Sequence, residues 1–541
     1  MSETIIIPRI KTGELSAGEP AQAGKPDGAH SRFRLSARQR GRLPLVAILI
    51  VQASIALSLS NSIFIDEGCY LFSGHTEWAA MFGGPTPMNY ATFFSGSPYL
   101  YPLIGAVANA LGGLGAARGF STLCMLAATV MLYRATVVLF GKQAAIWAAA
   151  LFALCGPCLF MAHLATFDAP AVALLAAGFY FAVRSGTNKV LMLETIALTT
   201  LAVAFKYAAL VYAVPMVLTA AVCAIPTVGW RWAAARGAVL GFLMFVTGFA
   251  LLCIAGPNTV AGLLSTTLQR PPATNTVDQV AERSAAYVGF ILILATFGTL
   301  WFSLRRKPRD GAPAPAEPGT GPLVESWGWK PRALLALTLT GAALIAPVGD
   351  MRLHTLTSLE KHAGYGLMFA APMGGWLISK LAGSTWWRTI PALVLVAALG
   401  AYGANQAHQF FSEWPTSTAY IKTLETLTAS DPAGTHILAE DPWIERYYLG
   451  DAGNRFIWDD TYSLYFTDTA GKNLTGLPAY QAAISERYFG VVVIDYQATP
   501  SIDPSLDQAL QTSGYQRTAV PAYDRYGEID VEIWTLIGVR K

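Results

Sequence analysis

Repeated apolar runs long enough to cross a lipid bilayer are the feature that most constrains how this chain folds. Of its 541 residues, 53% are hydrophobic and only 13% are charged, whereas a soluble domain averages about 25% charged residues. A helix that spans a bilayer needs about 20 apolar residues. Runs that approach this length lie near 43–63, 119–139, 143–163, 168–184, 190–205, 207–226, 233–255, 286–304, 331–348, 363–381 and 388–406. We therefore predict a polytopic α-helical membrane protein with about eleven transmembrane helices.

The distribution of basic residues predicts which side of the membrane each loop occupies. Cytoplasmic loops of membrane proteins are enriched in Lys and Arg. Every predicted inner loop is basic if the N-terminus lies inside and the shorter run 98–112 is a re-entrant or interface-lying helix. The residues that carry this charge are Arg134, Lys142, Arg184, Lys189, Arg231, Arg236, Arg305, Arg332, Lys380 and Arg388. We expect a multi-pass protein of the cell (plasma or inner) membrane with a cytoplasmic N-terminus and an extracytoplasmic C-terminus.

Composition divides the chain into three parts. Residues 1–42 are polar, rich in Gly, Pro and Ala, and end in several arginines, which is typical of a disordered basic cytoplasmic tail. We expect the transmembrane domain over 43–406, with a long first outer loop over 64–117. After residue 406 charges return and helical and β patterns alternate, which predicts an extracytoplasmic α/β domain over 407–541. Its predicted helices cover 415–429 and 505–513, and its predicted strands cover 436–440, 488–495 and 531–536.

Two adjacent carboxylates, Asp66 and Glu67, directly follow the first apolar run. A carboxylate costs about 2.5–3.5 kcal/mol at the bilayer centre and less toward the interface. One interpretation is a solvated helix end that marks the interface, and the other is a catalytic base at the membrane surface. Asp168 could be only the N-cap of a later helix. It nevertheless reaches the same membrane face as Asp66 in the predicted topology, and this favours the catalytic interpretation.

Basic side chains on the predicted outer face could bind a phosphate group. Lys206, flanked by apolar residues at a helix junction, either extends toward the interface or pairs with an anionic ligand. Arg352, Lys361 and His362 fall together in an outer loop, against the usual inner bias of basic residues, and this favours a site for a lipid phosphate. Arg118, at the start of the second predicted span, is a further candidate.

Other motifs in the sequence are weaker evidence for a function. Cys155 and Cys158 have the spacing of a thioredoxin-like redox pair but lie inside an apolar run, so we expect no redox role. The six cysteines all lie in or beside apolar segments, and we predict no disulfide framework. The histidines lack the spacing of metal ligands, no P-loop is apparent, and the basic residues follow the membrane topology. We therefore expect no nucleic-acid partner.

The order of these elements resembles the GT-C glycosyltransferases, in the branch with protein O-mannosyltransferases and lipid A aminoarabinose transferases. The matching elements are IDEGCY (65–70), SPYLYP (97–102), ARGFS (117–121), LFGK (139–142), ATFDAP (165–170), FKY (205–207) and SLEKH (358–362). Many members have His-Pro-Pro or Tyr-Pro-Pro where this chain has Ser97-Pro98. The resemblance covers the first 230 residues best and implies a GT-C fold.

The resemblance also implies a reaction. The donor would be a sugar linked to polyprenyl phosphate, and the acceptor a hydroxyl of a protein, lipid or polysaccharide on the extracytoplasmic face. Asp66 would be the general base of a direct inverting displacement, with Glu67 and Asp168 orienting the acceptor or the base. The groups that would bind the donor phosphate are Lys206, Arg352, Lys361, His362 and Arg118.

Two questions stay open at this point. The three carboxylates could supply oxygen ligands to a divalent cation, as some relatives do, but no metal or other cofactor is firmly predicted. A transporter or flippase of polyprenyl-linked glycans, or a non-catalytic protein that binds them, is the alternative to an enzyme. Transporters often show internal repeats and broken helices at the midplane, and the sequence has neither.

Overall fold

The structure, a computed structural model, describes residues 42–91, 94, 100–305, 322–383 and 385–536. The predicted tail up to residue 41, and Ser97 and Pro98 of the SPYLYP element, lie outside these residues. From Pro44 onward, the described residues belong to one compact unit.

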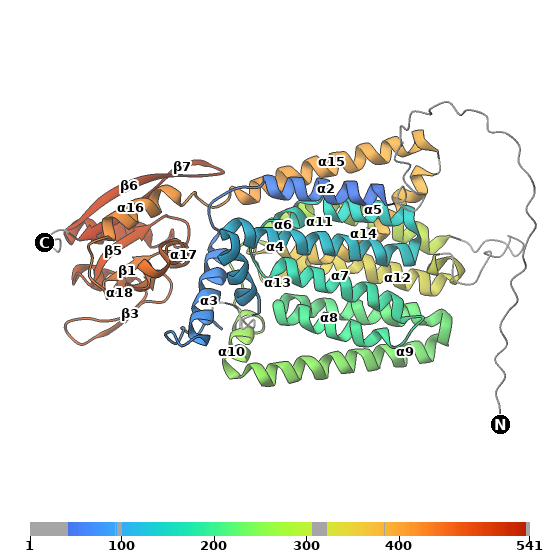
Figure 1. Ribbon diagram of the computed structural model, residues 1–541, viewed down its shortest axis with the longest axis horizontal. Coiled ribbons are helices and arrows are strands. Elements are labelled where there is room, and N and C mark those ends of the chain that lie inside the picture. The colour runs from blue at the N-terminus through green and yellow to red at the C-terminus, as the bar shows by residue number, and fades with distance from the viewer. Residues whose placement is uncertain (1–41, 92–93, 95–99, 306–321, 384, 537–541) are drawn as a thin grey trace, which may run out of the picture. The chain divides into compact units, whose positions relative to one another are not determined.

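Within the described ranges, the chain up to residue 411 forms helices and no strand (Figure 1). This is the secondary structure that a chain needs in lipid, because a helix satisfies its own backbone hydrogen bonds. The α-helices are α2 (Leu43–Ser58), α3 (Ile65–Met81), α4 (Leu100–Phe140), α5 (Lys142–Ala153), α6 (Gly156–Ala162), α7 (Asp168–Ser185), α8 (Leu191–Phe205), α9 (Ala213–Ala255), α10 (Pro257–Thr266), α11 (Val277–Leu304), α12 (Trp329–Gly341), α13 (Ile345–Arg352), α14 (Leu359–Ala382) and α15 (Trp386–Phe411).

Five helical stretches of the described chain are long and apolar enough to cross a membrane, and the bent pair α5 and α6 would make a sixth. The predicted count of about eleven spans is therefore not confirmed. Of the run 98–112, the described residues 100–112 form the first part of α4, whose backbone leaves the helical conformation at Gly112 and Gly113. The φ angle of Gly113 is +64°, which only glycine adopts readily.

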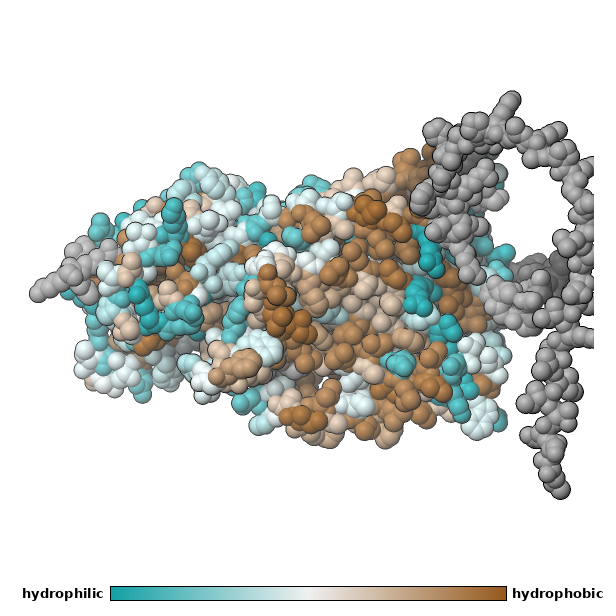
Figure 2. Space-filling model, viewed as in Figure 1, coloured by the Kyte–Doolittle hydropathy of each residue, from teal (hydrophilic) through white to brown (hydrophobic). Residues whose placement is uncertain are grey.

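Hydrophobic side chains gather on the outside of the helices, as lipid contact requires (Figure 2). On α9, Phe242, Phe245 and Phe249 are all more than half exposed. By contrast, most of α14 is buried among the other helices. Small residues permit this close packing: a Cβ atom on Gly375 of α14 would lie 2.5 Å from the backbone nitrogen of Ala148 in α5.

The strands of the described chain all follow α15 (Figure 1). They form a five-stranded sheet of order β2-β1-β5-β7-β6 and a separate β3-β4 hairpin. Neighbours β2, β1 and β5 are parallel, whereas β7 is antiparallel to both β5 and β6. The strands are β1 (His436–Ala439), β2 (Ile457–Asp460), β3 (Tyr465–Thr467), β4 (Asn473–Thr475), β5 (Phe489–Ile494), β6 (Tyr515–Asp524) and β7 (Gly527–Leu536).

Four helices accompany this sheet, namely α16 (Thr418–Thr428), α17 (Pro442–Gly453), α18 (Leu477–Ser485) and α19 (Asp503–Thr512). The two helices and three strands expected after residue 406 are confirmed as α16, α19, β1, β5 and β7. Helix α17 begins shortly after the end of β1 and packs on α3. The packing is close, because a Cβ atom on Gly68 would lie 2.8 Å from the carbonyl oxygen of Trp443.

Candidate active site

Asp66 lies in the first turn of α3 and pairs with Lys361 near the start of α14. The Nζ atom of Lys361 donates a hydrogen bond to Oδ2 of Asp66 at 2.6 Å. The Lys361 side chain is 4% exposed, whereas that of Asp66 is 33% exposed. Oδ1 of Asp66 has no hydrogen-bond partner among the residues that the structure describes. Asp66 is therefore held through one oxygen and open at the other.

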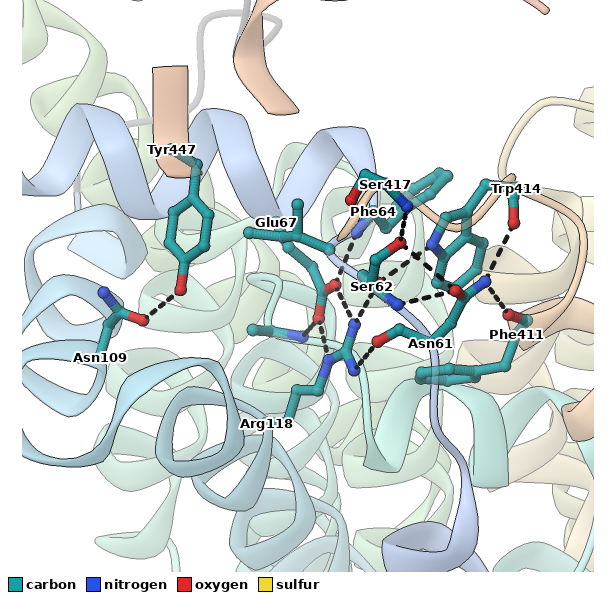
Figure 3. A network of polar contacts seen from close by, with 12 residues as sticks. Asn61, Ser62, Phe64, Glu67, Asn109, Arg118, Phe411, Trp414, Ser417 and Tyr447 are labelled. Carbon is teal, nitrogen blue, oxygen red and sulfur yellow. Dashed lines mark hydrogen bonds and ion pairs between the residues drawn. The ribbon is translucent and has the colours of Figure 1, made fainter. Parts of the chain in front are cut away.

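The neighbouring carboxylate, Glu67, is fully buried and bonded through both oxygens (Figure 3). Arg118 of α4 donates from Nε to Oε1 at 2.8 Å and from Nη2 to Oε2 at 2.7 Å. The backbone N–H groups of Ala165 and Phe64 add bonds of 2.7 and 2.9 Å. A buried carboxylate with four donors is a structural anchor and has no oxygen left for an incoming group.

Arg118 uses its other N–H groups on the loop that leads into α3 (Figure 3). Its Nη1 and Nη2 atoms donate to the carbonyl oxygens of Asn61 and Ser62 at 2.9 and 3.0 Å. The side chain of Asn61 donates in turn to the carbonyl oxygens of Phe411 and Trp414 at 2.7 and 3.0 Å. These contacts tie the start of α3 to the end of α15. They favour a structural role for Arg118 over the phosphate-binding role that the sequence suggested.

Asp168 begins α7 and is fully buried. Its Oδ1 atom lies 2.5 Å from Nζ of Lys206 and accepts a hydrogen bond from the hydroxyl of Tyr365 at 3.2 Å. Tyr365 lies four residues after Lys361 on α14, so the two side chains share one helix face. Helix α14 therefore contacts both Asp66 and Asp168.

The other two predicted phosphate-binding residues form no hydrogen bond or ion pair with the four side chains of these ion pairs in the described chain. His362 follows Lys361 on α14, and its Nδ1 atom lies 3.6 Å from Oδ2 of Asp350 in α13. Arg352, the last residue of α13, is exposed and forms no ion pair within the described part of the chain. Contact of either residue with a phosphate stays a prediction.

A cavity of about 230 Å³ opens beside Asp66. One side of it belongs to the first two turns of α3, and the other side to the loops that follow β1 and β2. The lining residues are Ile65, Asp66, Cys69, Tyr70, Glu440, Asp441, Pro442, Trp443, Asp460 and Tyr462. Asp66 is the one of the three predicted acids that lines it.

The site residues do not fit a divalent cation. In the ranges that the structure describes, no group of three or more His, Cys, Asp or Glu side chains has an arrangement that could hold a metal ion. Glu67 and Asp168 are already paired with Arg118 and Lys206.

Comparison with solved structures identifies the fold, whereas comparison with sequences does not. No model of a protein family matches the sequence, and no curated protein matches it either. A solved structure of ArnT from Cupriavidus metallidurans, bound to undecaprenyl phosphate, matches at a TM-score of 0.52 and 14% identity, over 92% of this chain and 98% of that chain. The oligosaccharyltransferase AglB from Archaeoglobus fulgidus, in complex with an inhibitory peptide and a dolichol-phosphate, matches at 0.54 and 10% identity, over 90% of this chain and 74% of that chain.

The chain has the GT-C fold. The fold expected from the motif order is thereby confirmed: a multi-pass helical membrane protein that carries an α/β region at its C-terminal end. At 10–14% identity the likeness shows the GT-C fold alone, so activity is argued from the site.

Sequence reasoning missed several residues of this site. Tyr365 was not singled out, although its spacing from Lys361 puts both on one face of a helix. Asp441 and Asp460 come from strand ends in the C-terminal region, far from Asp66 in the sequence. Only the tertiary fold brings them to the cavity, so no local pattern could have indicated them.

Proposed function

We propose that this protein is a glycosyltransferase that moves a sugar from a polyprenyl-phosphate-linked donor to a hydroxyl acceptor. The reaction takes place at the extracytoplasmic membrane face. The observation that carries the proposal is the difference between the three predicted acids. Glu67 and Asp168 are buried in ion pairs, whereas Asp66 lines a cavity and has an oxygen without a partner. Such an oxygen is what a general base needs to reach an incoming hydroxyl.

In the proposed step, Oδ1 of Asp66 accepts the proton of the acceptor hydroxyl. The hydroxyl oxygen forms a bond to the anomeric carbon of the sugar as the bond from that carbon to the phosphate oxygen breaks. The bonding electrons leave on the polyprenyl phosphate, which gains a negative charge. The displacement inverts the anomeric configuration and needs no covalent sugar–enzyme intermediate.

The leaving phosphate requires cations, and Lys361 lies closest to the base. Its ammonium group is buried and fixed 2.6 Å from Asp66, so it stabilises charge that develops on the phosphate without first being reorganised. Exposed Arg352 adds a second cation that no acid of the described chain neutralises. Lys206 and His362 contribute from beside Lys361, each paired with an acid of its own.

The GT-C fold supports the choice of donor, since the ArnT structure is bound to undecaprenyl phosphate and the AglB structure to a dolichol-phosphate. The nature of the sugar, hexose or pentose, is left to experiment. Purified full-length protein in lipid nanodiscs is offered a panel of polyprenyl-phosphate sugars with radiolabelled sugar, together with a mixture of hydroxyl acceptors. We expect transfer of label from at least one donor and release of polyprenyl phosphate. Binding of the donors without any loss of sugar contradicts the proposal and favours a binding protein or a flippase.

A further inference from the structure

The outer wall of the cavity beside Asp66 is formed by strand ends. Asp460 is the last residue of β2, and Glu440 and Asp441 directly follow β1. These neighbouring strands are parallel, so their carboxyl ends meet at one edge of the sheet. In open α/β sheets, ligands bind outside the carboxyl ends of the strands. The C-terminal region therefore turns the edge at which such sheets bind ligands toward the proposed base.

This wall is acidic and has no counter-ion inside the cavity. Within the described chain, no Lys, Arg or His lines the cavity, whereas Glu440, Asp441, Asp460 and Asp66 do. Two of these acids accept hydrogen bonds from the protein itself. Glu440 accepts hydrogen bonds from backbone N–H groups of the loop after β5, at 2.8 Å from Asp495, and Asp460 accepts them from the backbone of its own turn.

The side chain of Asp441 accepts no such hydrogen bond from the described residues. It occupies the N-cap of α17, where an aspartate usually accepts a backbone hydrogen bond, yet its side chain makes no capping bond. No other donor among the described residues bonds to it. Burial, and then the charges of Glu440, Asp66 and Asp460, raise the pKa of Asp441 to about 7. A half-buried carboxylate without a protein partner is available to a ligand.

A second unpartnered group faces Asp441 across the cavity. Tyr70, one turn after Asp66 on α3, is only 6% exposed and lines the cavity. Its ring packs 4.5 Å from that of Phe167, and its hydroxyl has no hydrogen-bond partner in the described part of the chain. A buried tyrosine hydroxyl usually finds a partner. Because Tyr70 lines the cavity, its unpartnered hydroxyl indicates a ligand that can donate or accept a hydrogen bond.

We propose that this cavity binds the acceptor of the transfer reaction, and that the acceptor is an uncharged terminal sugar of a glycan. The inference rests on the proposed function. An ionised carboxylate accepts hydrogen bonds, and a protonated one also donates, so Asp441, whose pKa is about 7, suits a ligand whose groups both donate and accept, as sugar hydroxyls do. Tyr70 and the exposed ring of Tyr462 add a hydroxyl and an aromatic face. Asp66 is paired with Lys361, but the lining holds no cation to neutralise Glu440, Asp441 and Asp460, and these acids disfavour an anionic acceptor.

The size of the cavity agrees with a single sugar. Pockets for drug-sized ligands have volumes of about 300–1,000 Å³, whereas this cavity has about 230 Å³. One ring of the acceptor therefore enters between α3 and α17, and the rest of the glycan extends outward past Tyr462.

The test compares two acceptors that differ only in charge. Full-length protein in nanodiscs receives a labelled donor with an uncharged oligosaccharide, or with the same oligosaccharide ending in a uronic acid. We expect wild type to prefer the uncharged form, and Asp441→Asn to reduce that preference about tenfold while leaving donor binding unchanged. Tyr70→Phe and Tyr462→Ala should raise KM for the uncharged acceptor. Asp451→Asn, an exposed acid on the same helix α17, is the matched control and should change nothing.

The possible results separate a failure of the acceptor proposal from a failure of the proposed function. An unchanged preference in Asp441→Asn, with unchanged KM in Tyr462→Ala, overturns it, and so does preferred transfer to a peptide or to an anionic lipid. Tyr462 is 63% exposed, so its variant tests the wall even if Asp441→Asn fails to fold. If wild type removes sugar from no donor with any acceptor, the proposed function itself fails and this inference fails with it.

Discussion

The Nζ atom of Lys361 lies 2.6 Å from Oδ2 of Asp66, although 295 residues separate them in the sequence. This ion pair puts the proposed base and the proposed phosphate-binding cation side by side. One turn later on the same helix, Tyr365 contacts Asp168. Helix α14 thus holds Asp66 and Asp168 in fixed positions relative to each other.

Removing the cation should weaken donor binding. We expect Lys361→Met to lower the affinity for undecaprenyl phosphate about tenfold to a hundredfold, because a hydrogen bond to a charged group contributes about 1.5–3 kcal/mol. Arg352→Gln should have a smaller effect, since Arg352 is exposed. Titration of labelled undecaprenyl phosphate in nanodiscs measures this affinity. Lys380→Met, at the opposite end of α14, is the control. An unchanged affinity in both Lys361→Met and Arg352→Gln excludes them from the phosphate site.

Breaking the pair between Glu67 and Arg118 should affect stability. We expect Glu67→Gln to lower the free energy of unfolding by about 3–5 kcal/mol, because it leaves the guanidinium of Arg118 buried without a counter-charge. Thermal unfolding of the purified protein measures the loss. Glu77→Gln on the same helix α3 should have little effect. The double variant with Arg118→Gln should lose less than the sum of the two single variants. Additive losses would mean that the two side chains do not act as a pair.

Asp441 should make stability depend on pH. Its pKa is raised from an ordinary 3.8 to about 7, so the folded protein binds this proton more tightly than the unfolded chain does. Its contribution to stability is therefore fully present below about pH 4 and is lost as the pH rises through 7. We expect wild type to lose stability relative to Asp441→Asn between about pH 4 and about pH 7, and the difference to stay constant above that. Parallel pH profiles of the two proteins would show that Asp441 has an ordinary pKa.

The predicted topology can be read by cysteine labelling. In a cysteine-free background, we expect Tyr462→Cys to react with a membrane-impermeant maleimide on whole cells. Glu325→Cys, an exposed position after the predicted inner linker, should react only after permeabilisation. Labelling of both positions from outside would break the assignment of sides.

The sequence predicted those parts of the fold that depend on local patterns. Apolar runs indicated membrane helices, and β-rich runs located β1, β5 and β7. It missed β6, whose run contains Pro521, and proline usually argues against a strand. The sheet tolerates Pro521 because β6 is an edge strand and pairs only with β7.

The site was predicted less completely, for a physical reason. Charge and position indicated Asp66, Asp168, Lys206 and Lys361, all of which the structure brings close to one another. They could not indicate that Arg118 pairs with Glu67, since an arginine at a helix start looks the same whether it meets a phosphate or a carboxylate. The partner is decided by how α3 and α4 pack, and such long-range contacts are not encoded in any local spacing.

The most direct test of the account is sugar transfer by Asp66→Asn. The asparagine keeps the size of the side chain and can still accept from Lys361, but it cannot take a proton from the acceptor. We predict that transfer from a labelled polyprenyl-phosphate sugar falls by at least about a hundredfold, while undecaprenyl phosphate still binds. Thermal stability falls by less than in Glu67→Gln, because Lys361 loses its counter-charge but Asp66 is 33% exposed, whereas Glu67 is fully buried. Transfer at the wild-type rate by Asp66→Asn would contradict the central claim that Asp66 is the general base.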